Sequence, residues 1–342
     1  MTILSSKIRV LVVDDSVTVR MIVRDILASD PAIEVVGQAL DGIEAVEKVR
    51  LLKPDVITLD VDMPRMNGID ALRQIMSIAP ETRVVMLSSL TLDGAQTTFD
   101  ALEAGAFDFI PKSAHFETEI LAKVKAAARL RVFHAVRSST PPPSRAVFTG
   151  KKIHVVGIGA STGGPIAVQE VLSQIPANFP HPLLVAIHMP KAYTGPYAER
   201  TNSKCAITVR EATAGEFLKP GVALIAPGGM HTMLMRQGGG LVVKTEASEN
   251  YPKHVFVPSI DIMMSSMAEA SGGAMLGVIL TGMGSDGFKG MQMLKQKGGA
   301  NIIQDQATST IYGMPRACIE GGVADMVLPL NQIGFEIARF GR

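Results

Sequence analysis

Short apolar runs alternate with stretches of helical periodicity along the first 128 residues. Between the first two runs, Val19, Ile22, Val23, Ile26 and Leu27 recur at the spacing of one helix face. The apolar runs are candidate strands, and we predict them at 10–13, 35–36, 56–59, 84–87 and 107–110. Strands that alternate with helices form a parallel sheet covered on both faces. Five such units in this length predict a flavodoxin-like (βα)5 domain.

A polar segment interrupts this alternation. Residues 138–144 read Ser-Ser-Thr-Pro-Pro-Pro-Ser, a composition that buries nothing and is typical of a semi-extended linker. Residues 121–132, just before it, are expected to continue the last helix of the first half. We therefore predict a first domain over 1–128, a linker over 129–150 and a second domain over 151–342.

The strand and helix alternation resumes after Lys152. A strand is predicted at 153–158, followed by a glycine-rich turn and a helix over 166–175. Strands at 232–235 and 241–245 are predicted to form a hairpin. Further strands are predicted at 183–187, 222–226, 274–280, 301–303 and 326–328. The second domain is thus expected to be a doubly wound, mostly parallel α/β domain with an antiparallel hairpin added to its sheet.

Composition and charge narrow the function classes. The 342 residues are 47% hydrophobic, as expected of two well-packed domains. No apolar run approaches the roughly 20 residues of a membrane span, and no signal-peptide order opens the sequence, so we expect a cytoplasmic protein without membrane insertion. Cys205 and Cys318 are expected as free thiols. Residues 1–128 hold 13 Lys and Arg against 19 Asp and Glu, and the remainder holds 20 against 13. This basic excess is too small to predict nucleic-acid binding.

Acidic residues stand at the carboxyl ends of the predicted strands in the first domain, where open parallel sheets bind ligands. Asp14 and Asp15 follow the first strand and Asp60 follows the third. Ser88 ends the fourth strand and Lys112 follows the fifth. Three carboxylates near a lysine predict a Mg²⁺ site at which one carboxylate accepts a phosphoryl group. Solvated loop acids are the alternative for any one of them, but they do not explain the whole set.

These motifs resemble the receiver domain of two-component response regulators over residues 7–128. The resemblance is carried by Val-Val-Asp14-Asp15-Ser, Leu-Asp60-Val-Asp-Met-Pro64-Arg-Met-Asn-Gly68, Ser88-Ser89 and Pro111-Lys112. It implies that Asp60 is the phosphoacceptor and that Asp14 and Asp15 help it to hold Mg²⁺. It also implies that Ser88 is the switch hydroxyl and Lys112 the lysine of the site. The family usually has Lys-Pro where this chain has Pro111-Lys112.

A serine lies in the glycine-rich turn after the first strand of the second domain. A dinucleotide fingerprint fails there because Thr162 replaces the third glycine, and a phosphate loop fails because the Gly-Lys-Ser/Thr ending is missing. Gly159-x-Ser161-x-Gly163 matches a nucleophile elbow. The N-terminus of the following helix would favour a developing oxyanion. A turn that only lets helix and sheet approach each other remains the alternative.

A nucleophilic serine needs a base and an acid that orients it. His188 ends the adjacent strand, and Asp286 lies in the loop after a later strand, so both are expected at the same sheet edge as Ser161. His231 is the reserve candidate for the base, and Asp261 for the acid. The order Ser, His, Asp differs from that of ordinary α/β-hydrolases.

The second half, over 151–340, resembles the catalytic domain of bacterial chemotaxis protein-glutamate methylesterases, the CheB family. The motifs are Gly-Ala-Ser161-Thr-Gly-Gly, His188-Met-Pro, Ala-Pro227-Gly-Gly-Met-His231, Pro258-Ser-Ile-Asp261 and Leu-Thr-Gly-Met283-Gly-Ser-Asp286-Gly. The resemblance implies a catalytic triad of Ser161, His188 and Asp286. It also implies that the Met283 N–H contributes to the oxyanion hole and that Thr162 shapes the pocket.

The resemblance further implies the reaction and its control. The substrates would be glutamate methyl esters, and also glutamines, on methyl-accepting chemotaxis receptors, hydrolysed through an acyl-enzyme without a cofactor. A chemotaxis histidine kinase would phosphorylate the receiver, with Mg²⁺, and so relieve a block of the catalytic edge. Two alternatives stay open: another acyl substrate, and a phosphorylation-controlled adaptor without catalysis.

Overall fold

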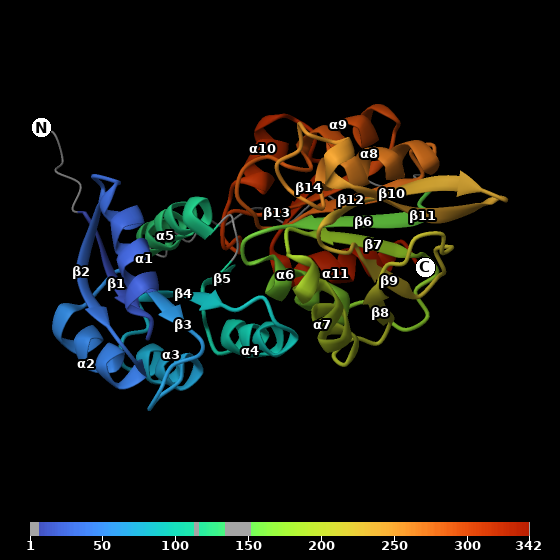
Figure 1. Ribbon diagram of the computed structural model, residues 1–342. Helices are drawn as coiled ribbons and strands as arrows, with labels where there is room; N and C mark the ends of the chain where they lie inside the picture. Colours follow the sequence, from blue (N-terminus) through green and yellow to red (C-terminus); the bar gives the residue numbers. More distant parts are fainter. Residues whose placement is uncertain (1–6, 113–115, 134–151, 342) are drawn as a thin grey trace, which may run out of the picture. The chain divides into compact units, whose positions relative to one another are not determined.

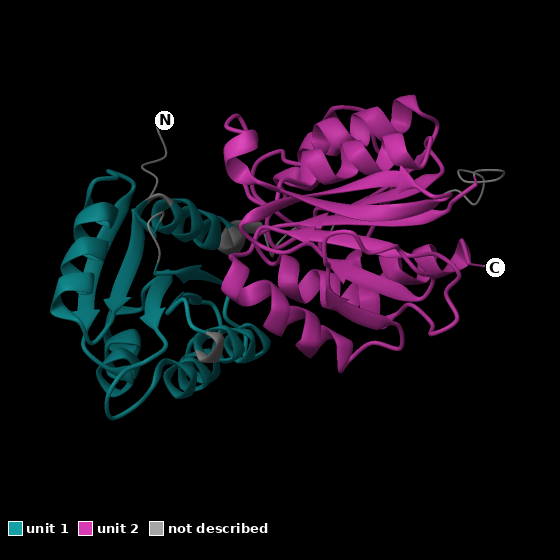
Figure 2. Cartoon of the chain, turned by 45° about the vertical axis from the view of Figure 1, so that its right-hand side comes forward, with its two compact units in different colours: residues 1–137 teal, residues 138–342 magenta. Residues whose placement is uncertain are grey.

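The computed structural model describes residues 7–112, 116–133 and 152–341, and the elements given below are those of these residues (Figure 1). The chain divides into two compact units, Met1–Arg137 and Ser138–Arg342 (Figure 2). Each unit holds its own parallel sheet, and we describe each by itself.

The expected linker overlaps the last helix of the first unit. Helix α5 runs over Phe116–Phe133, so residues 129–133 are helical rather than extended. The rest of the expected linker, 134–150, with its proline-rich stretch, lies outside the described residues. The domain boundaries therefore stay predictions.

The first unit contains a five-stranded sheet of order β2-β1-β3-β4-β5, in which each pair is parallel. The strands are β1 (Ile8–Val13), β2 (Ile33–Ala39), β3 (Val56–Asp60), β4 (Arg83–Ser88) and β5 (Asp108–Pro111). The helices are α1 (Val17–Ala28), α2 (Gly42–Leu52), α3 (Gly68–Ile78), α4 (Leu92–Glu103) and α5. This order is that of flavodoxin-like folds, so the predicted fold class of this half is confirmed.

Polar residues fix where the helices of the first unit begin. Four residues each precede a helix, and the side chain of each accepts a hydrogen bond from the backbone N–H three residues later: Ser16, Asp41, Asn67 and Thr91. Such caps satisfy N–H groups that have no partner inside the helix, and each contributes about 1 kcal/mol. The caps therefore fix where the loops between the strands and these helices end.

The second unit contains a seven-stranded sheet of order β14-β13-β12-β6-β7-β9-β8, also parallel throughout. Its strands are β6 (Val155–Ala160), β7 (Leu183–Ile187), β8 (Thr208–Glu211), β9 (Val222–Ile225), β12 (Met275–Ile279), β13 (Ala300–Gln304) and β14 (Met326–Leu328). The chain adds strands on both sides of β6. Ligands of such sheets bind at the carboxyl ends of strands where the order reverses.

Helices cover both faces of this second sheet, as Figure 1 shows: α8, α9 and α10 lie over one face, and α6, α7 and α11 over the other. Their bounds are α6 (Gly164–Ser173), α7 (Lys191–Asn202), α8 (Ile260–Ala270), α9 (Phe288–Gln296), α10 (Met314–Glu320) and α11 (Leu330–Arg339). The predicted doubly wound, parallel α/β class is therefore confirmed.

The hairpin is present, but it is not part of the large sheet. Strands β10 (Met230–Gln237) and β11 (Gly240–Ala247) pair with each other as a separate two-stranded sheet that packs on α8. The structure differs from the sequence prediction in two smaller points. Strand β8 was not predicted, because Thr-Val-Arg-Glu carries no apolar run. The strand predicted at 153–158 begins at Val155, so His154 is exposed and lies just before β6.

Glycines let α8 approach β6 closely. A Cβ on Gly159 would lie 2.4 Å from Cγ2 of Ile260, the first residue of α8, and a Cβ on Gly157 would lie 2.9 Å from Sδ of Met264 on the same helix. Fully buried methionines fill the space around this contact, among them Met263, Met264, Met267 and Met291. The beginning of α8 is thereby held against the carboxyl end of β6.

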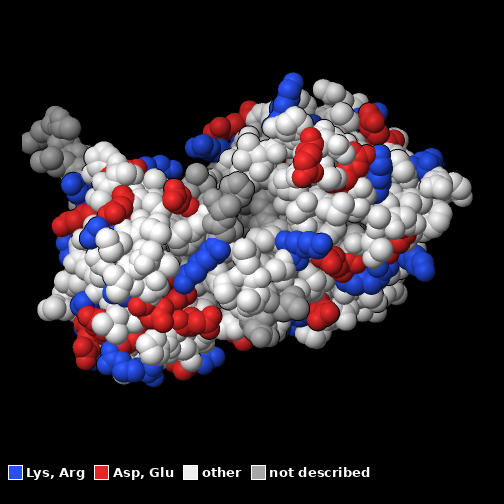
Figure 3. All heavy atoms as spheres, viewed as in Figure 1, with Lys and Arg blue, Asp and Glu red and all other residues white. Residues whose placement is uncertain are grey.

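The surface of the described residues mixes both charges. On the face in Figure 3, acidic and basic side chains are interspersed on the elements of each unit. The expectation that the protein binds no nucleic acid stays a prediction. Among the helices of the described residues, none has the length and apolar character needed to cross a membrane.

Candidate active site

Ser161 follows the last residue of β6, the strand at which the sheet order reverses. Its N–H donates to the carbonyl of Thr281, which follows β12, at 3.0 Å, and its carbonyl accepts from Gly164 N at 2.6 Å. The turn needs Gly163, whose φ is +73° and where a Cβ would meet Thr310 at 2.5 Å. A left-handed glycine directly before α6 thus places the serine at a sharp strand-to-helix turn.

His188 follows β7, the strand next to β6, and connects the serine to an acid. Its Nδ1 lies 3.1 Å from Ser161 Oγ, and its Nε2 lies 2.8 Å from Asp286 Oδ2. A carboxylate can only accept, so Nε2 carries the proton and Nδ1 is left to accept from the serine hydroxyl. The arrangement is that of a nucleophile, a base and an orienting acid.

The Asp286 carboxylate accepts from four further groups besides His188. Oδ1 accepts from Ser259 Oγ at 3.1 Å, Asp261 N at 2.9 Å and Gly287 N at 3.1 Å, and Oδ2 accepts from Ile260 N at 2.7 Å. Burial acts to raise the pKa of Asp286, but the bonds from His188 and from the first N–H groups of α8 outweigh it and hold the pKa below its usual value. The acid is therefore fixed in its charged form.

The loop after β12 contacts Ser161 through Gly282, the residue directly before Met283. Gly282 packs directly against Ser161, because a Cβ there would lie 2.9 Å from Cβ of Ser161. Gly282 N donates to Ile311 O at 3.0 Å, and its carbonyl accepts from Met314 N at 2.8 Å. Across the described part of the chain, no group accepts the N–H of Met283. Thr162 is 4% exposed, and its carbonyl accepts from Thr281 Oγ1. The oxyanion role of Met283 and the pocket role of Thr162 stay predictions.

The first unit gathers its predicted site residues at its own sheet edge. Carboxylate oxygens of Asp14, Asp15 and Asp60 all lie within 4.8 Å of one another. Lys112 Nζ lies 2.9 Å from Asp14 Oδ2 and 2.8 Å from Asp60 Oδ1. Burial raises the pKa of Asp60 to about 6, against the opposing effect of the Lys112 ammonium. Ser88 lies at the end of β4, where its Oγ is 2.6 Å from Thr98 Oγ1.

Comparison with known proteins gives the family. A family model described as CheB methylesterase matches residues 156–337, and one described as response regulator receiver domain matches residues 10–125. A curated relative from Geobacter sulfurreducens, named protein-glutamate methylesterase/protein-glutamine glutaminase 1, is 57% identical over 98% of both chains. One from Geobacter metallireducens with the same name and the number 5 is 56% identical over 97% of both chains.

The chain belongs to the CheB methylesterase family. A solved structure supports this assignment for the second unit: the crystal structure of the Thermotoga maritima CheB methylesterase catalytic domain is 38% identical. The match covers 55% of this chain and 98% of the Thermotoga chain, with a TM-score of 0.53. The predicted family, and the predicted class of a methylesterase with a receiver domain, are confirmed.

The two reserve candidates in this methylesterase unit form hydrogen bonds with groups other than Ser161 and His188. His231 is fully buried, and its Nδ1 accepts from Ser259 N at 3.1 Å. Burial lowers its pKa, so it is held as a neutral structural side chain. Asp261 accepts Gly290 N at 3.0 Å and so caps α9. His231 binds Ser259, which donates to Asp286, and Asp261 donates its own N–H to Asp286. Neither side chain is a member of the chain of hydrogen bonds from Ser161 to Asp286.

Two residues that contact the chain of hydrogen bonds were not predicted. Ser259 donates to Asp286 and also caps α8, accepting from Ile262 N at 3.4 Å. Phe256 stacks on His188, with ring centroids 4.2 Å apart. A serine directly before an apolar helix is a cap signal that the sequence does contain. A single aromatic residue in a loop carries no such signal, because no periodicity places its side chain.

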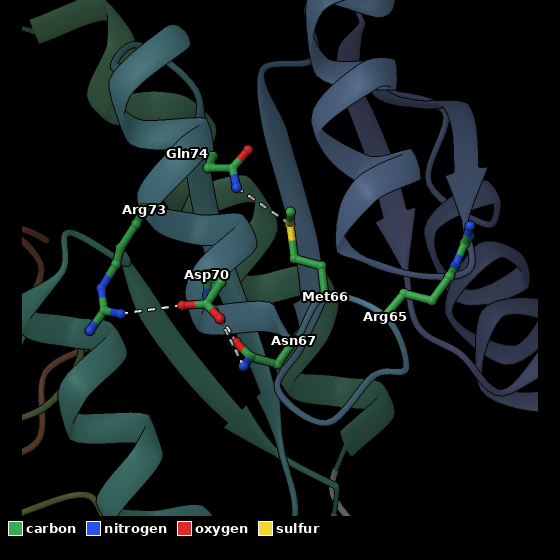
Figure 4. A pocket seen from close by; sticks show the side chains of 6 residues that line it. All are labelled: Arg65, Met66, Asn67, Asp70, Arg73 and Gln74. Atoms are coloured by element: carbon green, nitrogen blue, oxygen red, sulfur yellow. Dashed lines mark hydrogen bonds and ion pairs between the residues drawn. The ribbon is translucent and has the colours of Figure 1, made fainter.

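A surface hollow of about 430 Å³ lies on the receiver unit of the methylesterase, between the loop after β3 and the first turns of α3 (Figure 4). It is lined by Arg65, Met66, Asn67, Asp70, Arg73 and Gln74. Asp70 pairs with Arg73 at 3.3 Å and accepts from Asn67 at 3.1 Å, and Arg65 pairs with Asp41 outside the hollow. The charges of the hollow are thus already paired, and we assign it no role.

Proposed function

We propose that this protein removes methyl esters from glutamate side chains of chemotaxis receptors, and deamidates glutamines there, under the control of phosphorylation at Asp60. The observation that carries the proposal is the hydrogen-bonded chain Ser161–His188–Asp286 at the reversal point of the sheet. The names of the two Geobacter relatives support the substrate. The match of residues 10–125 to receiver domains supports the control.

Acylation begins with proton transfer from Ser161 Oγ to His188 Nδ1 over 3.1 Å. The oxygen attacks the carbonyl carbon of the ester, and the resulting oxyanion accepts from the Met283 N–H. Asp286, held ionised by its donors, stabilises the imidazolium through Nε2–H. His188 then gives its proton to the leaving methoxide, and methanol departs from an acyl-enzyme on Ser161.

Deacylation repeats these steps with water. His188 Nδ1 takes a proton from the water as it attacks the acyl-enzyme, and the same proton then returns to Ser161 Oγ as the free carboxylic acid is released. Glutamine follows the same route, because its tetrahedral intermediate differs only in the leaving group. His188 protonates the departing amine, and ammonia is lost in place of methanol.

Control is assigned to the acidic cluster of the receiver unit. Carboxylate oxygens are the ligands that Mg²⁺ prefers, and three within 4.8 Å of one another fit that ion. Asp14, Asp15 and Asp60 would hold it, and its charge would favour the ionised form of Asp60 and neutralise phosphoryl oxygens. Asp60 accepts the phosphoryl group from a chemotaxis histidine kinase, and Lys112 pairs with the new charge. Ser88, now bonded to α4, would turn to the phosphoryl oxygens and so report phosphorylation.

The test is the fate of the receptor side chain in water enriched in ¹⁸O. A methylated cytoplasmic receptor fragment is incubated with the full chain and a small phosphodonor, and its peptides are weighed by mass spectrometry. We expect glutamate methyl esters and glutamines to become glutamates that carry one ¹⁸O, with no conversion by Ser161→Ala. Receptor that binds the protein but keeps its esters would contradict the proposal and favour an adaptor. Conversion by Ser161→Ala would contradict the assigned nucleophile.

A further inference from the structure

The ring of Phe256 lies flat on the imidazole of His188. Their centroids are 4.2 Å apart and their planes differ by 7°. Phe256 is 42% exposed and its neighbour Val255 is 88% exposed. Burial of its own apolar surface therefore explains only part of why this ring lies where it does. The contact places an aromatic face against one whole side of the base.

The segment that carries Phe256, residues 251–259, is held at both ends by polar contacts. His254 N donates to Tyr251 O at 3.0 Å, and His254 Nδ1 lies 3.1 Å from Ser259 Oγ. Ser259 in turn donates to Asp286 and is bound through its N–H to His231. One segment thus contacts the acid through Ser259 and the base through Phe256. Ser259 therefore holds both the segment that carries the Phe256 ring and the Asp286 carboxylate.

An aromatic face carries negative charge density and attracts a cation that lies over it. In the proposed mechanism, His188 becomes a cation when it takes the proton of Ser161 or of the attacking water. A stacked ring is therefore most favourable when the reaction is under way, and it also stops the imidazole from turning away from Ser161 and Asp286. The phenyl ring has no donor or acceptor that competes for the two imidazole nitrogens.

We propose that Phe256 is a positioning residue that acts through His188, holding the imidazole in register and stabilising the imidazolium of the transition state. This inference rests on the proposed function in one respect, that His188 is the general base. Interactions that strengthen only in the transition state change kcat rather than KM. Loss of the ring should lower kcat by about 2- to 30-fold, the range of cation–π contacts.

The experiment compares Phe256→Ala, Phe256→Tyr and Phe256→Leu with the wild-type full chain, and uses Val255→Ala as the matched control on the same segment. One readout is the rate at which methanesulfonyl fluoride, a small probe, labels Ser161, followed by mass spectrometry. This rate needs the base but no receptor. The other readout is kcat and KM for ester hydrolysis on the receptor fragment. Thermal unfolding checks that each variant is folded.

We expect Ala and Leu to slow labelling and to lower kcat by about 2- to 30-fold with KM nearly unchanged. Tyr and the Val255→Ala control should stay within about twofold of wild type on the same scale. Leu keeps apolar bulk without a ring face, so Leu as fast as Tyr would overturn the proposal even if Ala unfolds. A change confined to KM would overturn it as well. If wild type is labelled but hydrolyses no receptor ester, the proposed substrate fails, and the labelling series still decides the role of Phe256.

Discussion

At the scale of single residues, the site depends on how Asp286 is held. Its two oxygens accept from His188, from Ser259 and from the backbone of residues 260, 261 and 287. No side chain other than a carboxylate accepts at every one of these positions. The acid thus joins the base to the beginning of α8.

We expect Asp286→Asn to lower kcat for ester hydrolysis by about 10⁴-fold, the cost measured for the corresponding change in a serine protease. The amide presents an N–H₂ group either to His188 or to the backbone donors, so the imidazole loses its orientation. Steady-state kinetics on the receptor fragment measure the effect, with Asp305→Asn as a control carboxylate outside the chain of hydrogen bonds. A fall of less than about tenfold would contradict the role given to Asp286.

The lowered pKa of Asp286 also makes stability depend on pH. Because its folded pKa lies below the unfolded value, the ionised carboxylate stabilises the fold above that unfolded value, about 3.9. The contribution is lost as the pH falls through the folded pKa. We expect the wild type to be more stable than Asp286→Asn at pH 7, and the gap in unfolding temperature to shrink below pH 4. A gap that widens on acidification would contradict this.

The sequence predicted that Ser161, His188 and Asp286 lie at one edge of the sheet, because each follows a strand and strand ends of a parallel sheet converge. It ranked Asp286 above Asp261 only through motif resemblance, since their contacts with α8 and α9 are visible only in the structure. The role of Phe256 could not be predicted either, because a loop side chain takes its direction from neighbours that are distant in sequence.

At the scale of elements, α8 and β6 form the contact on which the site is built. The regular strands were predictable from apolar runs, and β7 and β14 have the predicted bounds. The hairpin was predicted as a pair of strands, but its separation from the large sheet was not. The sequence of β10 and β11 shows that they can pair with each other, and it does not show whether either strand also pairs with the sheet. Strand β8 is short and polar, and only its place next to β9 makes it a strand.

Gly159→Ala should push α8 away from β6 and, through α8, displace the backbone N–H groups that bind Asp286. The new Cβ meets Ile260, a β-branched residue at the start of the helix whose N–H binds the acid. We expect a loss of about 1–3 kcal/mol in the free energy of unfolding and a fall in kcat. Gly157→Ala is the matched variant, because its Cβ meets the flexible ends of Met275 and Met264. It should keep kcat near wild type, and equal kcat losses in both variants would contradict this account.

At the scale of the whole molecule, two units with separate cores carry separate chemistry. The fold class of each unit followed from strand and helix alternation, and the family followed from motifs at the strand ends. The acidic first half and the mildly basic second half are a property of the sequence alone. Charge totals do not say which residues couple the units, so coupling has to be measured through activity.

Phosphorylation of Asp60 should raise hydrolysis by Ser161 without changing the residues of the site. Asp60→Asn removes the phosphoacceptor but leaves Ser161, His188 and Asp286 in place. We therefore expect this variant to keep the basal rate of the wild type and to lose all stimulation. Loss of the basal rate as well would mean that Asp60 supports the fold rather than the control.

The most direct test of the central claim is methanol release from methylated receptor membranes, with and without a small phosphodonor and Mg²⁺. We expect release that rises with the phosphodonor in the wild type, stays at the basal rate in Asp60→Asn and vanishes in Ser161→Ala. Methanol release that is unchanged by the phosphodonor in a protein shown to be phosphorylated would contradict control through Asp60. Release that persists in Ser161→Ala would contradict Ser161 as the nucleophile.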